Sequence, residues 1–201
     1  MSARIDIVNT ALVQLGAKTI TSLEDDSRQA EVMKTIYYIA RDAVLEDANW
    51  TFATKPFTPA ASASAPQYGW THAYPIPSDI LRVTGVYRGY LGPWFPNANG
   101  QRPEWPKSPH VVMGGDILSN DNPIYCEGIR RMEDEGGYSA LFTDAFAQKL
   151  AYMAAPAITE SNPKRDFALG LYLAIIKTAK TRDGQQNTTQ RMRNTTIRYT
   201  R

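Results

Sequence analysis

The stretch VNTALVQLG at residues 8–16, followed by SLEDD at residues 22–26, decides the fold that we expect. Its apolar residues recur every three or four positions, which is the spacing of one face of a helix. Ser2 can cap the start of this helix, and Gly16 stands where a left-handed C-terminal cap belongs. We therefore predict a first helix that ends near Leu15.

A second helix is predicted after the acidic turn, where Asp25, Asp26 or Ser27 can cap its free amide groups. Its apolar arc is wide, so it needs two partners and should be the central helix of a bundle. We interpret its charged residues as solvated flanks or contacts between subunits. The apolar positions are Met33, Ile36, Tyr37, Ala40 and Val44, widened by Val32, Ile39 and Ala43; the charged ones are Glu31, Lys34, Arg41, Asp42 and Glu46.

The second helix is followed by the aromatic motif Trp50-Thr51-Phe52. Large aromatic side chains mostly supply buried area, so the favoured interpretation is a plug that closes the bundle. Stacking on a ligand is the alternative.

This part of the chain resembles the tail tubular protein A family, the head-to-tail adaptors of short-tailed, T7-like bacteriophages. The similarity rests on the order and spacing of several residues over about fifty positions. A second similar stretch, YPIPSDILRV at residues 74–83, looks like an entry strand of such proteins. The first pattern consists of Asn9, Leu12, Leu15-Gly16, Ser22-Leu23-Glu24-Asp25, Arg41 and Trp50-Thr51-Phe52.

The resemblance implies a structural virion protein without catalytic residues. Such proteins form a ring, usually dodecameric, which joins the portal protein to the tail nozzle protein around the channel for genomic DNA. The chain would be assembled in the bacterial cytoplasm and would end at the head–tail junction of the virion. DNA would pass through the ring without sequence-specific recognition.

Composition agrees with such a protein. The chain has 201 residues, 43% of them hydrophobic and 21% charged, and its formal charge is only +2. A protein that grips nucleic acid through phosphates is expected to carry a broad basic excess. The single cysteine, Cys126, excludes an intrachain disulfide. No run reaches the roughly 18 apolar residues of a membrane span, and the polar start is unlike a signal peptide, so we expect a soluble protein.

Residues 55–136 are predicted to form an inserted antiparallel β module that faces the tail nozzle. Helical periodicity is lost there, and short β-rich runs appear at Ile80–Tyr90, His110–Met113 and Ile124–Ile129. Gly114-Gly115 is predicted to turn a hairpin. The proline-rich loop at residues 89–109 carries three nozzle-facing candidates, although they could instead cover the module's own open face. These candidates are Trp94, Phe95 and Trp105.

Helical patterning returns after residue 137. Ser139 can cap a third helix, which Pro156 should end, and Asn162 can cap a fourth with Pro163 at its first position. We therefore predict an α+β protein with a discontinuous four-helix bundle, residues 1–54 and 137–183, that forms the ring. The third helix should bury Phe142, Ala145, Phe146, Leu150 and Met153, and the fourth helix should bury Phe167, Leu171, Ile175 and Ala179. The residues that we predict for the core of the whole bundle are Leu12, Leu15, Ile36, Trp50, Phe52, Phe146, Leu150 and Leu171.

Residues 184–201 are predicted to form a basic, extended C-terminal arm. The segment has four arginines and no acid, and its removal changes the formal charge from +2 to −2. We expect it to dock on the portal or a neighbouring subunit, with DNA phosphates or solvent as alternatives. Its candidate contact residues are Arg191, Arg193, Thr196, Ile197, Arg198, Tyr199 and Arg201.

Catalytic, cofactor and metal sites are not predicted. His72, His110, Cys126 and Asp116 match no compact zinc motif, and Gly114-Gly115-Asp116 lacks the context of a phosphate-binding loop. The acidic run at residues 133–135 is interpreted as a solvated loop or a ring contact. The alternatives to an adaptor are a head-completion connector of a long-tailed phage, a non-specific DNA-binding protein and a small hydrolase.

Overall fold

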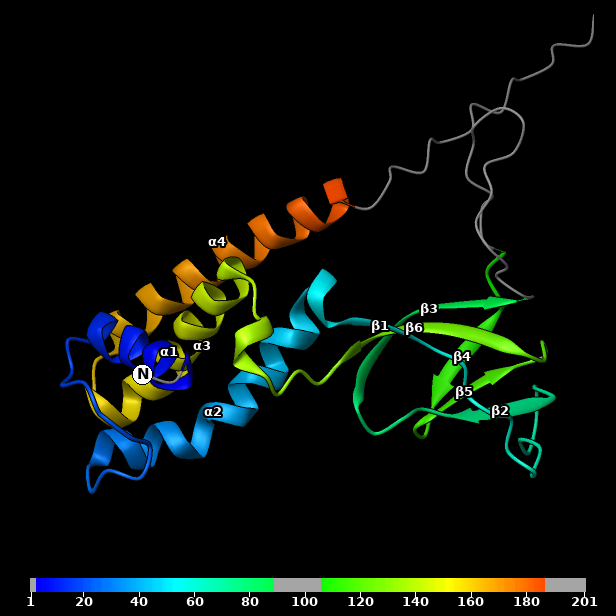
Figure 1. Ribbon diagram of the computed structural model, residues 1–201, viewed down its shortest axis with the longest axis horizontal. Coiled ribbons are helices and arrows are strands. Elements are labelled where there is room, and N and C mark those ends of the chain that lie inside the picture. The colour runs from blue at the N-terminus through cyan, green and yellow to red at the C-terminus, as the bar shows by residue number, and fades with distance from the viewer. Residues whose placement is uncertain (1–2, 89–105, 187–201) are drawn as a thin grey trace, which may run out of the picture.

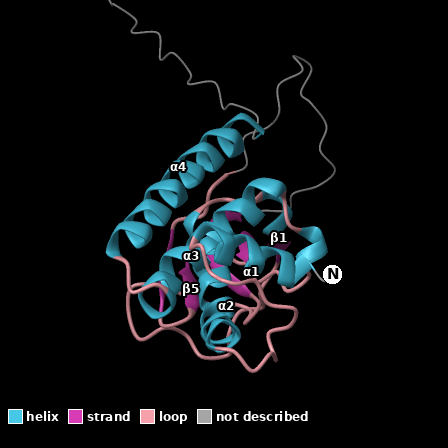
Figure 2. Cartoon of the chain, turned by 90° about the vertical axis from the view of Figure 1, so that its left-hand side faces the viewer, coloured by secondary structure: helices cyan, strands magenta, loops and turns pink. Residues whose placement is uncertain are grey.

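The computed structural model describes residues 3–88 and 106–186, with side chains described as far as residue 182. Within these ranges it has four α-helices and two small antiparallel sheets, which confirms the predicted α+β class. The described strands all lie between the second and third helices in chain order. Figure 1 shows the helices at one end of an elongated molecule and the strands at the other, and Figure 2 views the helical end.

The first two helices, α1 (Ala3–Gln14) and α2 (Arg28–Asp47), follow the expected boundaries. Gly16 has a φ of 66°. Its amide donates to the carbonyl of Val13, and the amide of Ala17 donates to the carbonyl of Leu12, each at 2.9 Å. This pair of bonds is a Schellman cap. Ser27 is the N-cap of α2, and its side chain accepts a hydrogen bond from the amide of Ala30.

The Gly16 cap can be tested with a matched pair of substitutions. Gly16→Ala should lower the free energy of unfolding by about 1 kcal/mol, because an L-residue at this positive φ is strained. Gly170→Ala should raise it by about 0.5–1 kcal/mol, because that glycine lies inside a helix with open space around it. Urea denaturation measures both. Two changes of the same sign would contradict the assigned cap.

The prediction that the second helix is central is wrong. The helix α3 (Ala140–Ile158) packs against α1, α2 and α4 (Asn162–Gln186), whereas Ile39 on α2 is 61% exposed. Small side chains explain this arrangement, because they let three neighbouring helices approach α3 closely. The buried alanines of α3 are Ala145, Ala147, Ala151, Ala154 and Ala155.

Two predicted boundaries near the third and fourth helices are also wrong. Pro156 lies inside α3, because the amide of Thr159 still donates to the carbonyl of Ala155 at 2.9 Å. The backbone leaves the helix at Glu160, which has a φ of 52°. In α4, the amide of Arg165 donates to the carbonyl of Ser161, so Ser161 has the N-cap position and Pro163 is the second helical residue.

Most of the predicted bundle core is buried, and so is Ala179 of α4. At the other three positions predicted for the buried face of α4, the next residue along the chain is buried instead. Leu12, Leu15, Trp50, Phe146 and Leu150 are buried, and Ile36 and Phe52 are half-buried against them. Leu171 is only half-buried, and Phe167 is 66% exposed. Met153 and Ile175 are also half-buried against the core rather than inside it. The residues of α4 that are buried are Ala168, Tyr172, Ile176 and Ala179.

The strands form two three-stranded sheets, with the orders β1-β6-β3 and β2-β5-β4. A core between them contains Tyr74, Val86, Ile117, Ile124 and Cys126. The two short 3-10 helices, η1 (Thr51–Ala53) and η2 (Glu135–Gly137), stand at the two connections between the helices and the strands. The strands are β1 (Thr54–Phe57), β2 (His72–Pro75), β3 (Ile80–Arg88), β4 (His110–Met113), β5 (Asp116–Ser119) and β6 (Ile124–Arg130).

The predicted hairpin is confirmed, because Met113 pairs with Asp116 across Gly114 and Gly115, both of which have positive φ. The stretch at residues 74–83 is not a single strand. It contains the end of β2, a turn and the start of β3. Pro75 and Pro77 have no amide to donate, and the amide of Ile80 bonds back to the carbonyl of Pro77 at 2.9 Å.

The predicted arm overlaps the last helix. Because α4 continues to Gln186, residues 184–186 belong to a helix and not to an extended segment. None of the helices in the described ranges combines the length and the apolar character that crossing a membrane requires.

Candidate functional site

The residues that carry the family resemblance form a tightly hydrogen-bonded helix-loop-helix. Asn9 on α1 donates to the carbonyl of Ile20 and accepts from the amide of the same residue, each at 2.9 Å. Lys164 on α4 donates to the carbonyl of Leu15 at 2.6 Å. The motif therefore orders the loop between α1 and α2 and ties the end of α1 to α4.

Asp25 organises the acidic turn. Its carboxylate accepts from the amide of Thr21 at 2.8 Å, the amide of Ser22 at 3.1 Å and the hydroxyl of Thr21 at 3.1 Å. These bonds, above all the one from the Thr21 amide, lower the pKa of the Asp25 carboxyl. The motif SLED is thus explained by backbone geometry.

The Asp25 turn predicts a dependence of stability on pH. A carboxyl with a lowered pKa in the folded state stabilises the fold above its unfolded pKa of about 4, and this contribution is lost as pH falls through the lower folded value. Asp25→Asn should therefore lose less stability than the wild type between about pH 4 and pH 2. Urea denaturation across this range measures the difference, and parallel pH profiles would contradict the assignment.

Trp50 and Phe52 form the predicted aromatic plug. Trp50 is 5% exposed, and its indole Nε1 donates to the carbonyl of Val44 at 2.7 Å. The ring packs edge-on against Phe142, with 5.1 Å between the centroids, and Phe52 contacts the same ring at 5.2 Å. Because Trp50 is buried and its indole N–H already donates a hydrogen bond, a plug is favoured over stacking on a ligand.

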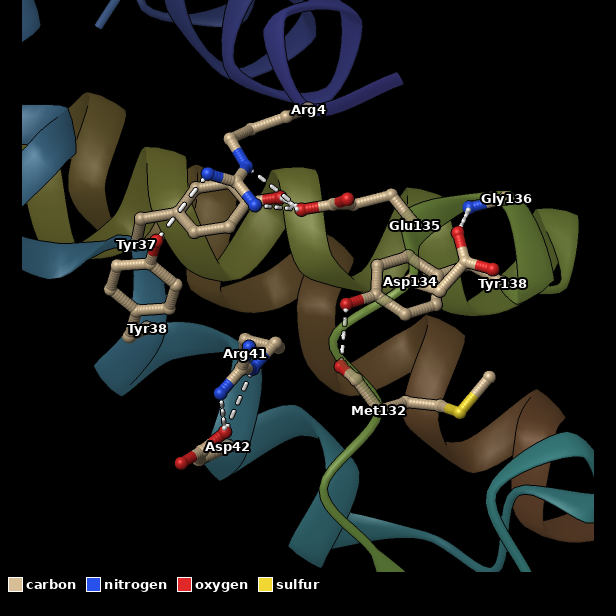
Figure 3. A network of polar contacts seen from close by, with 10 residues as sticks. All are labelled: Arg4, Tyr37, Tyr38, Arg41, Asp42, Met132, Asp134, Glu135, Gly136 and Tyr138. Atoms are coloured by element: carbon tan, nitrogen blue, oxygen red, sulfur yellow. Dashed lines mark hydrogen bonds and ion pairs between the residues drawn. The ribbon is translucent and has the colours of Figure 1, made fainter. Parts of the chain in front are cut away.

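A polar network joins the two helices α1 and α2 to the segment that returns from the strands (Figure 3). Glu135 accepts hydrogen bonds from Arg4 Nε at 2.8 Å and from the hydroxyl of Tyr37 at 3.3 Å. The guanidinium of Arg4 also forms an ion pair with this carboxylate at 2.7 Å. The hydrogen bond to Glu135 raises the pKa of Arg4, and burial raises the pKa of Tyr37.

A second pair of contacts in this network centres on Asp42. Its carboxylate accepts from Arg41 and from Arg131, in each case at 2.9 Å. Nearby, the hydroxyl of Tyr138 donates to the carbonyl of Met132 at 2.9 Å, and burial raises the pKa of Tyr138 to about 12. We call the set Arg4, Tyr37, Arg41, Asp42, Arg131, Glu135 and Tyr138 the junction network.

The junction network corrects two expectations. Arg41 is only 4% exposed and is not a solvated flank, and Glu135 has a side-chain exposure of 17% and is not a freely solvated loop residue. Sequence reasoning missed Glu135 because its partners, Arg4 and Tyr37, come from distant parts of the chain. It missed Arg41 because the burial of this side chain follows only from the fold, although its ion-pair partner is the adjacent Asp42. Each carboxylate of the network faces a guanidinium, an arrangement that holds segments together.

The residues considered for metal binding are spread over the strands. His72 on β2 and His110 on β4 flank Ser119 on opposite sides of β5, whereas Asp116 lies at the other end of that hairpin. Cys126 is buried, which raises the pKa of its thiol to about 12. Among the described residues, no three histidine, cysteine or acidic side chains are grouped so that they could hold a metal ion.

The predicted contact residues of the loop and the arm lie outside the described residues. This applies to Trp94, Phe95 and Trp105, and to every named position of the arm from Arg191 to Arg201. Their assignment to the nozzle, the portal or a neighbouring subunit stays a prediction.

Exposed apolar side chains mark surfaces that sequence reasoning did not identify. On the helices they are Val13, Ile39, Phe167 and Leu173, each more than half exposed. On β4, Val111 is 40% exposed, Val112 51% and Met113 53%. An apolar triplet next to a glycine turn is typical of a buried strand, so the pattern itself did not reveal an exposed edge.

Comparison with known proteins adds no assignment. No protein-family model matches the chain, and no curated protein sequence matches it significantly.

Proposed function

We propose that this chain is a subunit of a non-enzymatic adaptor ring that joins the portal protein to the tail nozzle protein of a short-tailed phage. The observation that carries the proposal is the two-ended architecture. A helical bundle that contains the family-like helix-loop-helix lies at one end, and the β module inserted between α2 and α3 lies at the other (Figure 1).

An adaptor must hold two binding ends in a fixed orientation, and the junction supplies the contacts for this. Arg131, just after β6, bonds to Asp42 on α2, and Arg82 on β3 donates to the side chain of Asn49 at 2.6 Å. Ile129 is buried in the helical core, and Leu81 and Met132 pack against it. Charge and apolar packing therefore both couple the β module to the bundle.

The exposed apolar residues of the bundle supply surfaces for ring contacts. Single exposed apolar residues are common, but Val13, Ile39, Phe167 and Leu173 are distributed over three helices. Contacts between different faces of neighbouring copies generate a ring when the rotation closes. In this arrangement the bundle forms the ring, the β module faces the nozzle, and the arm contacts the portal or a neighbouring subunit. The nearly balanced charge suits a channel through which DNA passes without being gripped.

The test compares the full chain with a chain that ends at Gln186, which keeps α4 intact. Each is mixed with the purified portal, and complexes are separated by size. We expect the full chain to form a portal complex and the truncated chain to lose it. If the truncated chain formed an equally stable complex, the portal contact would be assigned to the bundle and not to the arm. Binding to random DNA that falls steeply with salt, without portal binding, would favour a DNA-binding protein instead.

A further inference from the structure

The two sheets of the β module are separated by a gap between their edge strands β3 and β4. The two strands approach each other at one end only, where the amide of Arg88 donates to the carbonyl of Pro106 at 3.0 Å and the amide of Ser108 donates to the carbonyl of Val86 at 2.9 Å. After Ser108 the chain turns to pair with β5. Within the described residues, β4 pairs only with β5, and the first half of β3 pairs only with β6.

A groove of about 480 Å³ fills the gap. It is bounded by Ile80–Val83 of β3 on one side and by Val112 and Gly115 on the other, with Ile76, Pro77 and Ser78 completing it. Pairing alternates in an antiparallel ladder, and Met113 forms the hydrogen-bonded pair that closes the hairpin. The N–H and C=O of Val112 therefore point away from β5, toward this open edge.

The edge is unusual because β4 is exposed and apolar at once. Val111, Val112 and Met113 are each 40–53% exposed, although successive side chains point to opposite faces of a sheet. Natural proteins cover or charge such edges, because an open apolar edge pairs with other strands. One wall of the groove has backbone groups without a partner strand among residues 3–88 and 106–186, and apolar side chains surround it. Such a groove suits an extended peptide strand.

The sequence contains a suitable strand at residues 195–200, Thr-Thr-Ile-Arg-Tyr-Thr. In an extended conformation, Ile197 and Tyr199 share one face, and Thr196 and Arg198 share the other. The apolar face matches a groove whose charged lining residue is Arg82. Residue 195 lies nine positions after Gln186, a reach of up to about 30 Å.

The other segment outside the described residues is a poorer candidate. Residues 89–105 are tethered at both ends, next to the closed end of the β3–β4 pair. They also contain Pro93, Pro96 and Pro103, which have no amide for a ladder hydrogen bond.

We propose that residues 195–200 of a neighbouring copy of this chain insert as a strand between β3 and β4, with Ile197 and Tyr199 facing the groove. The choice of a neighbouring copy rests on the proposed ring, in which copies lie side by side. The inserted strand pairs with the open edge of β4, covers its apolar residues and links each copy to the next by a head-to-tail contact.

The experiment is a cysteine scan by mixing, with native Cys126 left in place because it is 2% exposed. Full-length Val112→Cys is mixed with size-tagged Thr196→Cys, Ile197→Cys, Arg198→Cys or Tyr199→Cys and oxidised gently. We expect covalent heterodimers at positions 197 and 199 at least about fivefold more than at 196 and 198, because only alternate side chains share a face. Tyr68→Cys, at a site 74% exposed on the same module, replaces Val112→Cys as the control and should give only background.

Equal crosslinking at all four positions, or crosslinking no better than the Tyr68→Cys control, would overturn the inference. The inference would also be overturned if a double variant, Val112→Cys with Ile197→Cys, formed its disulfide only within one chain. Portal binding is measured separately under reducing conditions. A portal-bound ring without the alternating pattern overturns this inference and leaves the adaptor function; the alternating pattern without portal binding supports strand exchange and overturns the adaptor function.

Discussion

Replacing Phe142 with alanine should lower the free energy of unfolding by about 3–5 kcal/mol, the largest effect expected for a single side chain of this fold. Phe142 is fully buried on the central helix α3. Its ring centroid lies 4.6 Å from that of Tyr138, 5.1 Å from that of Trp50 and 5.2 Å from that of Phe52. The substitution removes the ring that joins the aromatic plug to the start of α3. Urea denaturation followed by far-UV circular dichroism measures the loss.

Phe167 offers the matched control for this prediction. It is also a phenylalanine on a helix, but 66% of it is exposed. Phe167→Ala should change the free energy of unfolding by no more than about 0.5 kcal/mol. If the two substitutions had equal effects, α3 would not be the centre of the bundle.

Asp42→Ala should be the next most damaging change, because it leaves a buried guanidinium without its carboxylate. Arg41 is 4% exposed, and Asp42 is the partner of both Arg41 and Arg131. Removing one member of a fully buried pair costs about 3–5 kcal/mol, and the 26% exposure of the Asp42 side chain reduces the expected loss to about 2–3 kcal/mol. Chemical denaturation again provides the measurement.

The control for Asp42→Ala is Asp166→Ala. Asp166 also pairs with the arginine next to it, Arg165, but their side chains are 63% and 39% exposed. The loss there should be below about 1 kcal/mol, as for other surface ion pairs. A loss at Asp42 as small as at Asp166 would show that the junction network contributes little to the joining of the two modules.

Local signals predicted much of the helical architecture. Gly16, Ser27 and Ser139 mark helix ends because each satisfies backbone groups within a few residues, so a short window of sequence contains the whole interaction. The Gly114-Gly115 turn was predictable for the same reason. Such signals do not say which helix is central, and the alanine-rich α3 took that place through close packing with three partners.

Long-range pairing explains what the sequence did not reveal at the junction. Arg4 and Glu135 are separated by 131 positions, and Asp42 and Arg131 by 89. Only the folded chain brings these pairs together, so Glu135 looked like an ordinary surface charge. Arg41 pairs with the adjacent Asp42, but its burial likewise follows only from the fold. In α4, the weak contrast between its faces allowed Leu171 to be taken for the core residue, although Tyr172 is buried and donates to Asp47 on α2.

The exposure of strand β4 could not be predicted from the sequence for a related reason. Val111-Val112-Met113 has the composition of a buried strand, and its exposure follows from the separation of β3 and β4 after Ser108. The composition of a segment indicates that it can form a strand, but it does not indicate whether another strand lies next to it. The open groove follows from topology.

The adaptor account is tested most directly by electron microscopy of the full-length chain mixed with its portal. We predict a closed ring on one face of the portal, with the helical bundles forming the ring wall and the β modules on the side away from the portal. A portal that stays bare at saturating concentrations of the chain, or one that binds isolated copies without a ring, would contradict the account.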